Sequence, residues 1–79
     1  MTTIYYIEHV LHSGGDYIAE SVTFGSEADA RAFLAKHAIT AYQITREEVT
    51  LNYRKVITER LAKEVIAETD EYRQMIQLC

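Results

Sequence analysis

The sequence is poor in features that would indicate a membrane, an export route or a metal. It has one cysteine, Cys79, and no apolar run of about 18 residues, the length that a membrane-spanning helix needs. A single thiol cannot form an internal disulfide or a zinc site, and it fits a reducing compartment. The first residues, MTTIYYIEHV, carry no positive charge before an apolar stretch, so no signal peptide is expected. These absences predict a cytoplasmic protein without a membrane span.

Basic residues are missing from the first part of the chain. Residues 1–30 contain no Lys or Arg but five acids: Glu8, Asp16, Glu20, Glu27 and Asp29. An acidic surface repels phosphate backbones, so direct nucleic-acid binding is not expected, and a basic protein surface is the better partner. The alternative interpretation is that scattered carboxylates keep a small protein soluble.

The remaining composition is that of an ordinary globular domain. The chain has 79 residues, of which 48% are hydrophobic and 25% are charged. A chain of this length forms one domain, residues 1–79, and buries only about 60% of the surface that its unfolded form exposes. We therefore expect a single domain with a small core.

Two strands and a tight turn are predicted at the N-terminus. Residues 3–11 and 16–24 are rich in aromatic and β-branched side chains, and Gly14-Gly15 between them suits a type I′ turn. A two-residue loop fixes the register. The core face then pairs Leu11–Ile18, His9–Glu20, Ile7–Val22 and Tyr5–Phe24, and the other face pairs His12–Tyr17, Val10–Ala19, Glu8–Ser21 and Tyr6–Thr23.

A helix and a third strand follow. Ser26 with Asp29 resembles a capping box, so residues 27–38 are predicted to be helical, with Ala30, Phe33, Leu34 and His37 on the inward stripe. Residues 39–45, ITAYQIT, are expected to form the third strand. A right-handed connection places that strand beside the first, in the spatial order 2-1-3 with antiparallel neighbours.

The remainder of the chain has helical spacing. Its helix starts either at the capping box of Thr45 and Glu48 or near Asn52, because Val49 and Thr50 are weak helix formers. The apolar residues at helical spacing are Tyr53, Ile57, Leu61, Val65, Tyr72 and Ile76. The expected fold is therefore α+β, in the order ββαβα, with a three-stranded antiparallel sheet and two helices on one face.

The length of that C-terminal helix suggests an interface. A helix over residues 52–77 would overhang the sheet, unless it bends back near Thr69-Asp70. Exposed apolar residues are usually covered by a partner. This predicts a homodimer through Val65, Tyr72, Met75 and Ile76.

The candidate chemistry is weak. His9 opposite Glu20 could orient a general base, but a cross-strand polar pair is the simpler interpretation. His9 and His12 point to opposite faces and no fixed spacing adds His37, so no metal site is expected. The glycines Gly14-Gly15 belong to no phosphate loop, because neither the Lys-Ser/Thr nor a helix start follows them. No catalytic residue and no cofactor are predicted.

The basic residues of the C-terminal segment do not form a basic face. Arg46, Arg54, Lys55, Arg60, Lys63 and Arg73 alternate with seven acids: Glu47, Glu48, Glu59, Glu64, Glu68, Asp70 and Glu71. A solvated helix surface is the better interpretation.

Protein binding is the function that remains. Tyrosines supply amphipathic contact area, and the predicted docking edge of the hairpin contains Tyr6, Glu8, His12, Asp16 and Tyr17. In size, single-domain layout, acidic hairpin and lack of a catalytic signature, the chain is similar to small phage-encoded proteins that include anti-CRISPR and other anti-defence inhibitors. That resemblance implies a non-enzymatic, stoichiometric inhibitor of a defence complex in the host cytoplasm, and it assigns no functional residue. The alternative is a homo-oligomeric accessory protein.

Overall fold

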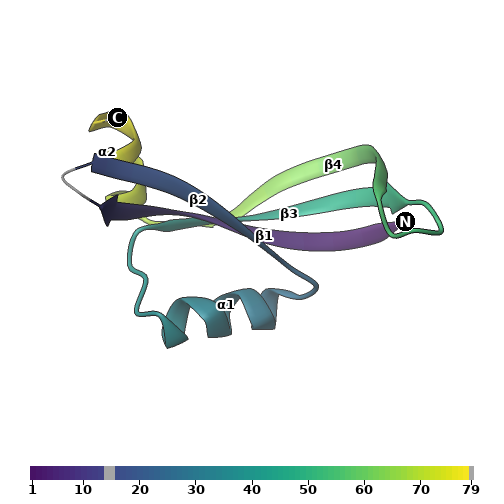
Figure 1. Cartoon of the computed structure of the whole chain (residues 1–79), viewed down its shortest axis with the longest axis horizontal. Helices are drawn as coiled ribbons and strands as arrows, with labels where there is room; N and C mark the ends of the chain where they lie inside the picture. Colours follow the sequence, from purple (N-terminus) through teal and green to yellow (C-terminus); the bar gives the residue numbers. More distant parts are fainter. Residues whose placement is uncertain (14–15, 79) are drawn as a thin grey trace.

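The protein folds into a twisted antiparallel sheet with one helix on each face (Figure 1). The computed structural model describes residues 1–13 and 16–78, except the side chains of residues 11–19 and 78. Its elements, in chain order, are β1 (Thr2–Ser13), β2 (Asp16–Phe24), α1 (Glu27–Lys36), β3 (Tyr42–Leu51), β4 (Ile57–Glu68) and α2 (Asp70–Leu78). The four strands lie in the order β2-β1-β3-β4. The α+β class is therefore confirmed, but the predicted three strands are too few.

The N-terminal hairpin has the predicted register. β1 and β2 are antiparallel, and all eight predicted pairs occur, His9 opposite Glu20 among them. The Gly14-Gly15 turn itself lies outside the described residues. Alternation along β1 places Ile7 and His9 on one face of the sheet and Tyr6 and Glu8 on the other.

α1 covers the first of these faces. Its start is the predicted one, because the Ser26 hydroxyl accepts a hydrogen bond from the Asp29 N–H at 3.1 Å. The helix ends at Lys36 and not at residue 38. Ala30 and Leu34 are buried as predicted, whereas His37 is exposed. Ala30 and Leu34 form the core together with Ile7 and Ile44. The half-buried side chains that pack against this core are Phe24, Phe33, Ile39, Tyr42, Ile66 and Ala67.

The long C-terminal helix is the main error of the sequence-based prediction. Thr45 and Glu48, the proposed capping box, lie inside β3, and residues 57–68 form a fourth strand. Asn52 stabilises the turn that reverses the chain direction between β3 and β4. Its side-chain oxygen accepts hydrogen bonds from the N–H groups of Arg54 and Val56 at 2.8 and 3.1 Å, which stabilises a turn in place of a helix.

β4 is irregular. Its pairing with β3 shifts at three points, so that Thr58, Leu61 and Ile66 are extra residues without a direct partner. Such bulges bend a strand and increase its twist. The β3–β4 hairpin accordingly curls away from α1 and toward the opposite side of the sheet (Figure 1).

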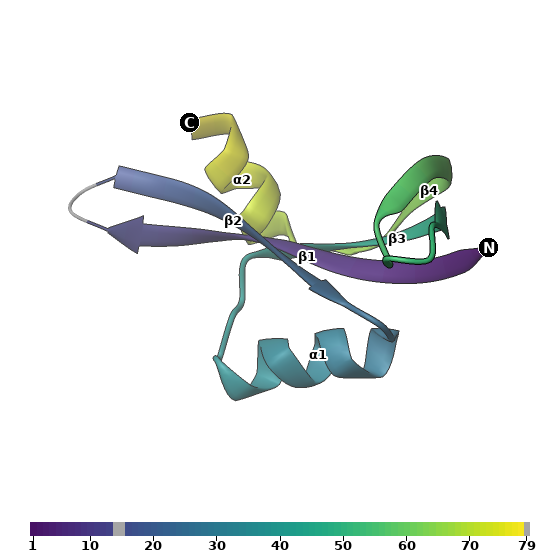
Figure 2. The ribbon, with the colours of Figure 1, turned by 45° about the vertical axis from the view of Figure 1, so that its right-hand side comes forward.

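The C-terminal helix that does form is short and lies on the opposite face from α1 (Figure 2). The prediction of two helices on one face is therefore wrong. Thr69 holds the start of α2, because its hydroxyl accepts a hydrogen bond from the Tyr72 N–H and another from the Tyr42 N–H. The Tyr72 hydroxyl in turn donates to Glu8 at 2.9 Å, and Glu8 points away from the α1 side. This contact fixes the helix above β1.

Candidate functional site: a groove on the sheet face opposite α1

The curled hairpin creates an open groove on the sheet face that α1 leaves uncovered. The groove encloses about 560 Å³, a volume in the range of binding pockets. β1 and β3 supply its floor, β2 supplies one wall and β4 the other. Its lining residues are Ile4, Tyr6, Ser21, Thr23, Glu47, Ile57, Arg60, Leu61, Ala62 and Lys63.

A buried carboxylate lies in the floor of the groove. The side chain of Glu47 is only 3% exposed, and its Oε1 accepts a hydrogen bond from the Arg60 guanidinium. The Arg60 side chain, in contrast, is 61% exposed. Burying an ionised carboxylate is unfavourable unless the charge is paired. Arg60 therefore neutralises Glu47 while it keeps most of its own surface in contact with solvent.

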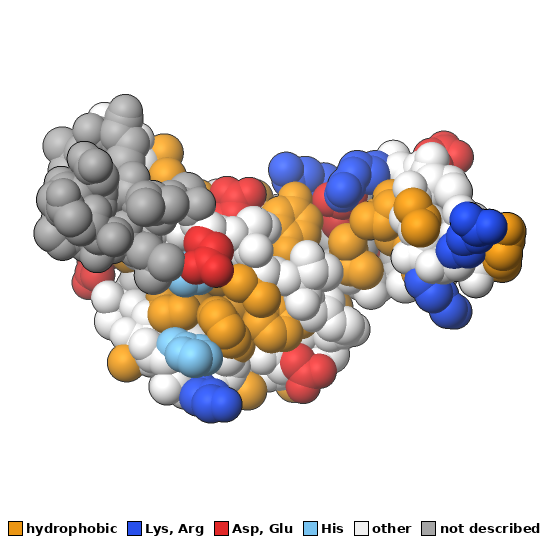
Figure 3. Space-filling model, viewed as in Figure 1, with side chains coloured by type: hydrophobic (Ala, Val, Ile, Leu, Met, Phe, Trp, Pro, Cys, Tyr) orange, Lys and Arg blue, Asp and Glu red, His pale blue; other side chains and the backbone are white. Residues whose placement is uncertain are grey.

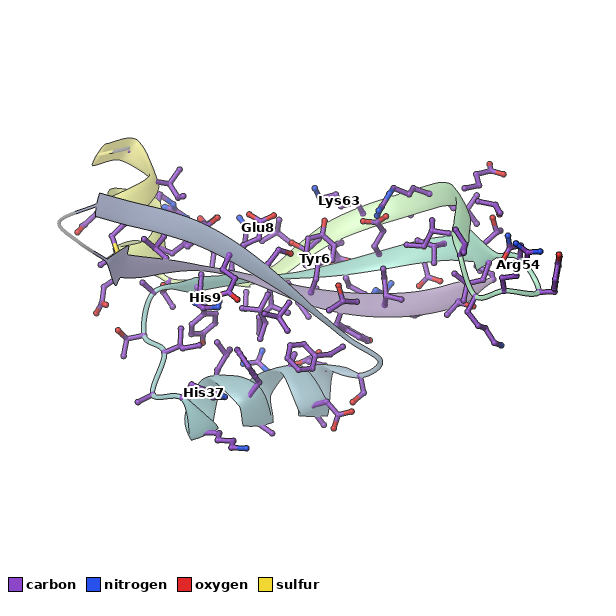
Figure 4. All side chains as sticks on the ribbon, in the orientation of Figure 1. Tyr6, Glu8, His9, His37, Arg54 and Lys63 are labelled. Carbon is purple, nitrogen blue, oxygen red and sulfur yellow. The ribbon has the colours of Figure 1, made fainter. Side chains whose placement is uncertain are left out.

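A second cation lies beside this pair. The Lys63 ammonium is 5.7 Å from the centre of the Tyr6 ring, within the range of a cation–π contact. Hydrogen bonding to Tyr6, with smaller contributions from the charges of Glu8 and Glu47, raises the pKa of Lys63. Figure 4 shows Tyr6, Glu8 and Lys63 on the same side of the sheet. The groove thus combines apolar side chains with two cations and one buried anion.

The predicted docking edge is only partly in this groove. Tyr6 lines it, whereas Glu8 lies toward α2 and accepts the hydrogen bond from Tyr72. The side chains of His12, Asp16 and Tyr17 lie outside the described part of the chain. The interpretation of these five residues as one surface therefore stays a prediction, with Tyr6 alone placed in the groove.

The residues of the predicted oligomer interface do not lie on one helix: Val65 belongs to β4, and the other three belong to α2. Tyr72 is 6% exposed and is packed within its own chain, so it is not available to a second copy. Val65 on β4 is 49% exposed, Ile76 on α2 is 42% exposed, and Met75 is half-buried. The overhanging helix on which this interface was predicted does not exist.

His9 occupies a structural position. The His9 ring is buried, and its centre lies 6.1 Å from the centre of the Phe33 ring. Its Nε2 lies 3.6 Å from Oε2 of Glu20. Among the described residues, neither ring nitrogen has a hydrogen-bond partner. In Figure 4, His9 and His37 lie on the α1 side of the sheet, away from the groove. His9 and Glu20 face each other as predicted, but the distance between them is too long for a hydrogen bond.

The described residues lack two further features. They contain no group of three His, Cys, Asp or Glu side chains that would hold a metal ion. They also contain no helix with the length and apolarity that crossing a membrane requires.

The sequence-based prediction missed the residues of β4 that complete the groove. From the sequence alone, Arg60, Leu61 and Lys63 are expected on an amphipathic helix and Glu47 among solvated acids. The β-branched residues Val56, Ile57 and Thr58 after Asn52 are the signal that indicates a strand here.

Comparison with protein-family models, with curated proteins and with solved structures finds no match to this chain.

Proposed function

We propose that this chain is a non-enzymatic protein-binding module that receives a segment of a partner protein in its groove. The observation that carries this proposal is the open groove itself, with its mixture of apolar and ionic side chains. A tyrosine, an arginine and a leucine, Tyr6, Arg60 and Leu61, line it together. Tyrosine and arginine are enriched among the residues that contribute most to protein interfaces.

The groove is less suited to catalysis. Among the described residues that line it there is no histidine or cysteine, and its carboxylate, Glu47, is paired with Arg60. A general base must reach a substrate proton, and a nucleophile needs a base beside it. Among the described residues, no side-chain hydrogen bond joins Ser21 or Thr23, the hydroxyl groups of the β2 wall, to Glu47 or Lys63.

A groove-filling variant tests the proposal. Peptides are first selected from a random-sequence display library on the wild-type protein, and their affinities are then measured for two variants. Ser21→Trp places an indole in the groove, whereas Ala28→Trp places one on an exposed position of α1. We expect the selected peptides to bind the wild type and Ala28→Trp equally and Ser21→Trp much more weakly. Equal binding to both variants would place the interaction elsewhere and contradict the proposal.

A homo-oligomeric accessory protein is the second candidate. Val65 and Ile76 are exposed apolar side chains, and a contiguous apolar patch that included them would be covered by a partner. This candidate expects a dimer in light scattering that Ile76→Asp dissociates. A monomer at every concentration would reject it.

The more specific role, inhibition of a host defence complex, stays a prediction from the resemblance to phage-encoded inhibitors. A protein-binding groove without catalytic machinery is compatible with stoichiometric inhibition. Purified defence complexes assayed with and without an equimolar amount of this protein would test that role directly.

A further inference from the structure

β4 combines an accessible strand edge with one wall of the groove. It pairs with β3 alone and ends the sheet, so alternate backbone groups along it point away from the other strands. The bulges interrupt this edge, but residues 62–65 keep a regular register with residues 45–48. A short extended segment of a partner can therefore lie along residues 62–65 and direct its side chains into the groove.

The β4 wall presents cations and apolar groups together. The Arg60 charge is matched by Glu47, whereas Lys63 makes no ion pair with a carboxylate within the described part of the chain. Leu61 is 45% exposed between these two residues. In Figure 3, most of the Lys and Arg side chains gather toward the β3–β4 end of the molecule. The wall thus offers the Lys63 ammonium, which has Glu8 and Glu47 in its surroundings but no direct ion pair among the described residues, beside apolar surface.

A second copy of the chain is a less suitable occupant of this edge. When two identical edge strands pair antiparallel about a two-fold axis, each face meets the same face of the other copy. In the registers that bring Arg60 or Lys63 opposite either of these residues in the second copy, two cations would face each other on the groove side. Like charges on facing positions of neighbouring strands are destabilising. A partner of opposite charge is favoured instead.

We infer that the groove binds an extended acidic segment, with a carboxylate of the partner against Lys63 and an apolar side chain against Leu61. This inference rests on the proposed protein-binding function and specifies the chemistry of the partner. Ion pairs at an open groove contribute specificity and association rate, and salt screens them. Binding is therefore expected to weaken as the ionic strength rises.

Fluorescence anisotropy with peptides of defined charge tests the inference. Three labelled peptides of equal length alternate valine with glutamate, lysine or glutamine, and a single-stranded oligothymidylate serves as a fourth probe. The variant is Lys63→Glu. The matched control, Lys55→Glu, makes the same charge change in the exposed turn before β4, outside the groove lining. Circular dichroism confirms that each variant is folded.

We expect the glutamate peptide to bind more tightly than the other probes. Lys63→Glu should weaken its binding by about tenfold or more, and Lys55→Glu should change it by less than about twofold. Equal binding of the three peptides, or an equal effect of both variants, would overturn the acidic partner but leave the protein-binding function standing. Failure of all three peptides to bind, or preferential binding of the oligothymidylate, would also overturn the acidic partner, whereas the protein-binding function is tested separately by the library-selected peptides.

Discussion

Removal of Arg60 is expected to destabilise the protein far more than removal of Glu47. Arg60→Met leaves the Glu47 carboxylate, which is 3% exposed, without its counter-ion. Leaving a buried charge unpaired costs about 3 to 5 kcal/mol, and we expect about 3 kcal/mol because Lys63 stays nearby. Glu47→Met instead leaves Arg60, a mostly exposed cation, which water solvates. Its cost should stay below about 1 kcal/mol.

The double variant provides the control. Glu47→Met with Arg60→Met replaces the ion pair by two apolar side chains of similar length, and it should be close to the wild type in stability. The coupling energy between the two positions is then about 3 kcal/mol in favour of the pair. The loss expected for Arg60→Met is a large share of the total stability, since about 4 to 12 kcal/mol is typical for a chain of this size.

Urea denaturation followed by far-ultraviolet circular dichroism measures these differences. The midpoint of Arg60→Met should fall clearly, while its dependence on urea concentration stays unchanged. If both single variants lose the same free energy of unfolding, or if the double variant is as unstable as Arg60→Met, Glu47 is not a buried charge that depends on Arg60.

Two further predictions concern the helices. Burial and the hydrogen bond to Glu8 raise the pKa of Tyr72 from 10.0 to about 12. The folded state therefore favours the protonated phenol. This preference contributes up to about 2.7 kcal/mol to the free energy of unfolding below pH 10, and the contribution is lost as the pH rises through 12. Urea titrations at about pH 9 and 11 measure this loss of stability, and Tyr72→Phe should remove it. The control, Tyr53→Phe, changes a residue that is 84% exposed and should retain the loss. Equal loss of stability at alkaline pH in the two variants would contradict the contact between Tyr72 and Glu8. Ser26→Ala removes the N-cap of α1 and should cost about 1 kcal/mol, and an unchanged urea midpoint would show that the cap contributes nothing.

The parts of the fold that follow local rules were predictable from the sequence. The two-residue loop between residues 13 and 16 set the β1–β2 register, and Ser26 with Asp29 marked the start of α1. β4 was not predictable in the same way, because its three bulges interrupt the alternation that identifies a strand. The resulting spacing of Ile57, Leu61 and Val65 coincides with that of a helix.

The groove depends on β4 and was missed for the same reason. The sequence placed Tyr6 on the correct face, but it could not show that Arg60 and Lys63 lie across the sheet from it. That proximity arises from the curl of the β3–β4 hairpin, a tertiary feature. Nor could it show that Tyr72 packs onto Glu8, because the short helix α2 crosses to the opposite face only after the fourth strand.

A nuclear magnetic resonance titration tests the central claim most directly, namely that the groove opposite α1 receives a partner segment. The amide signals of the isotope-labelled protein are followed while a peptide selected on the wild-type protein is added. We predict that the shifting signals belong to Tyr6, Ser21, Leu61 and Lys63, and that those of Arg31 and Lys36 on α1 stay in place. Shifts confined to α1, or no shifts at saturating peptide, would contradict the claim.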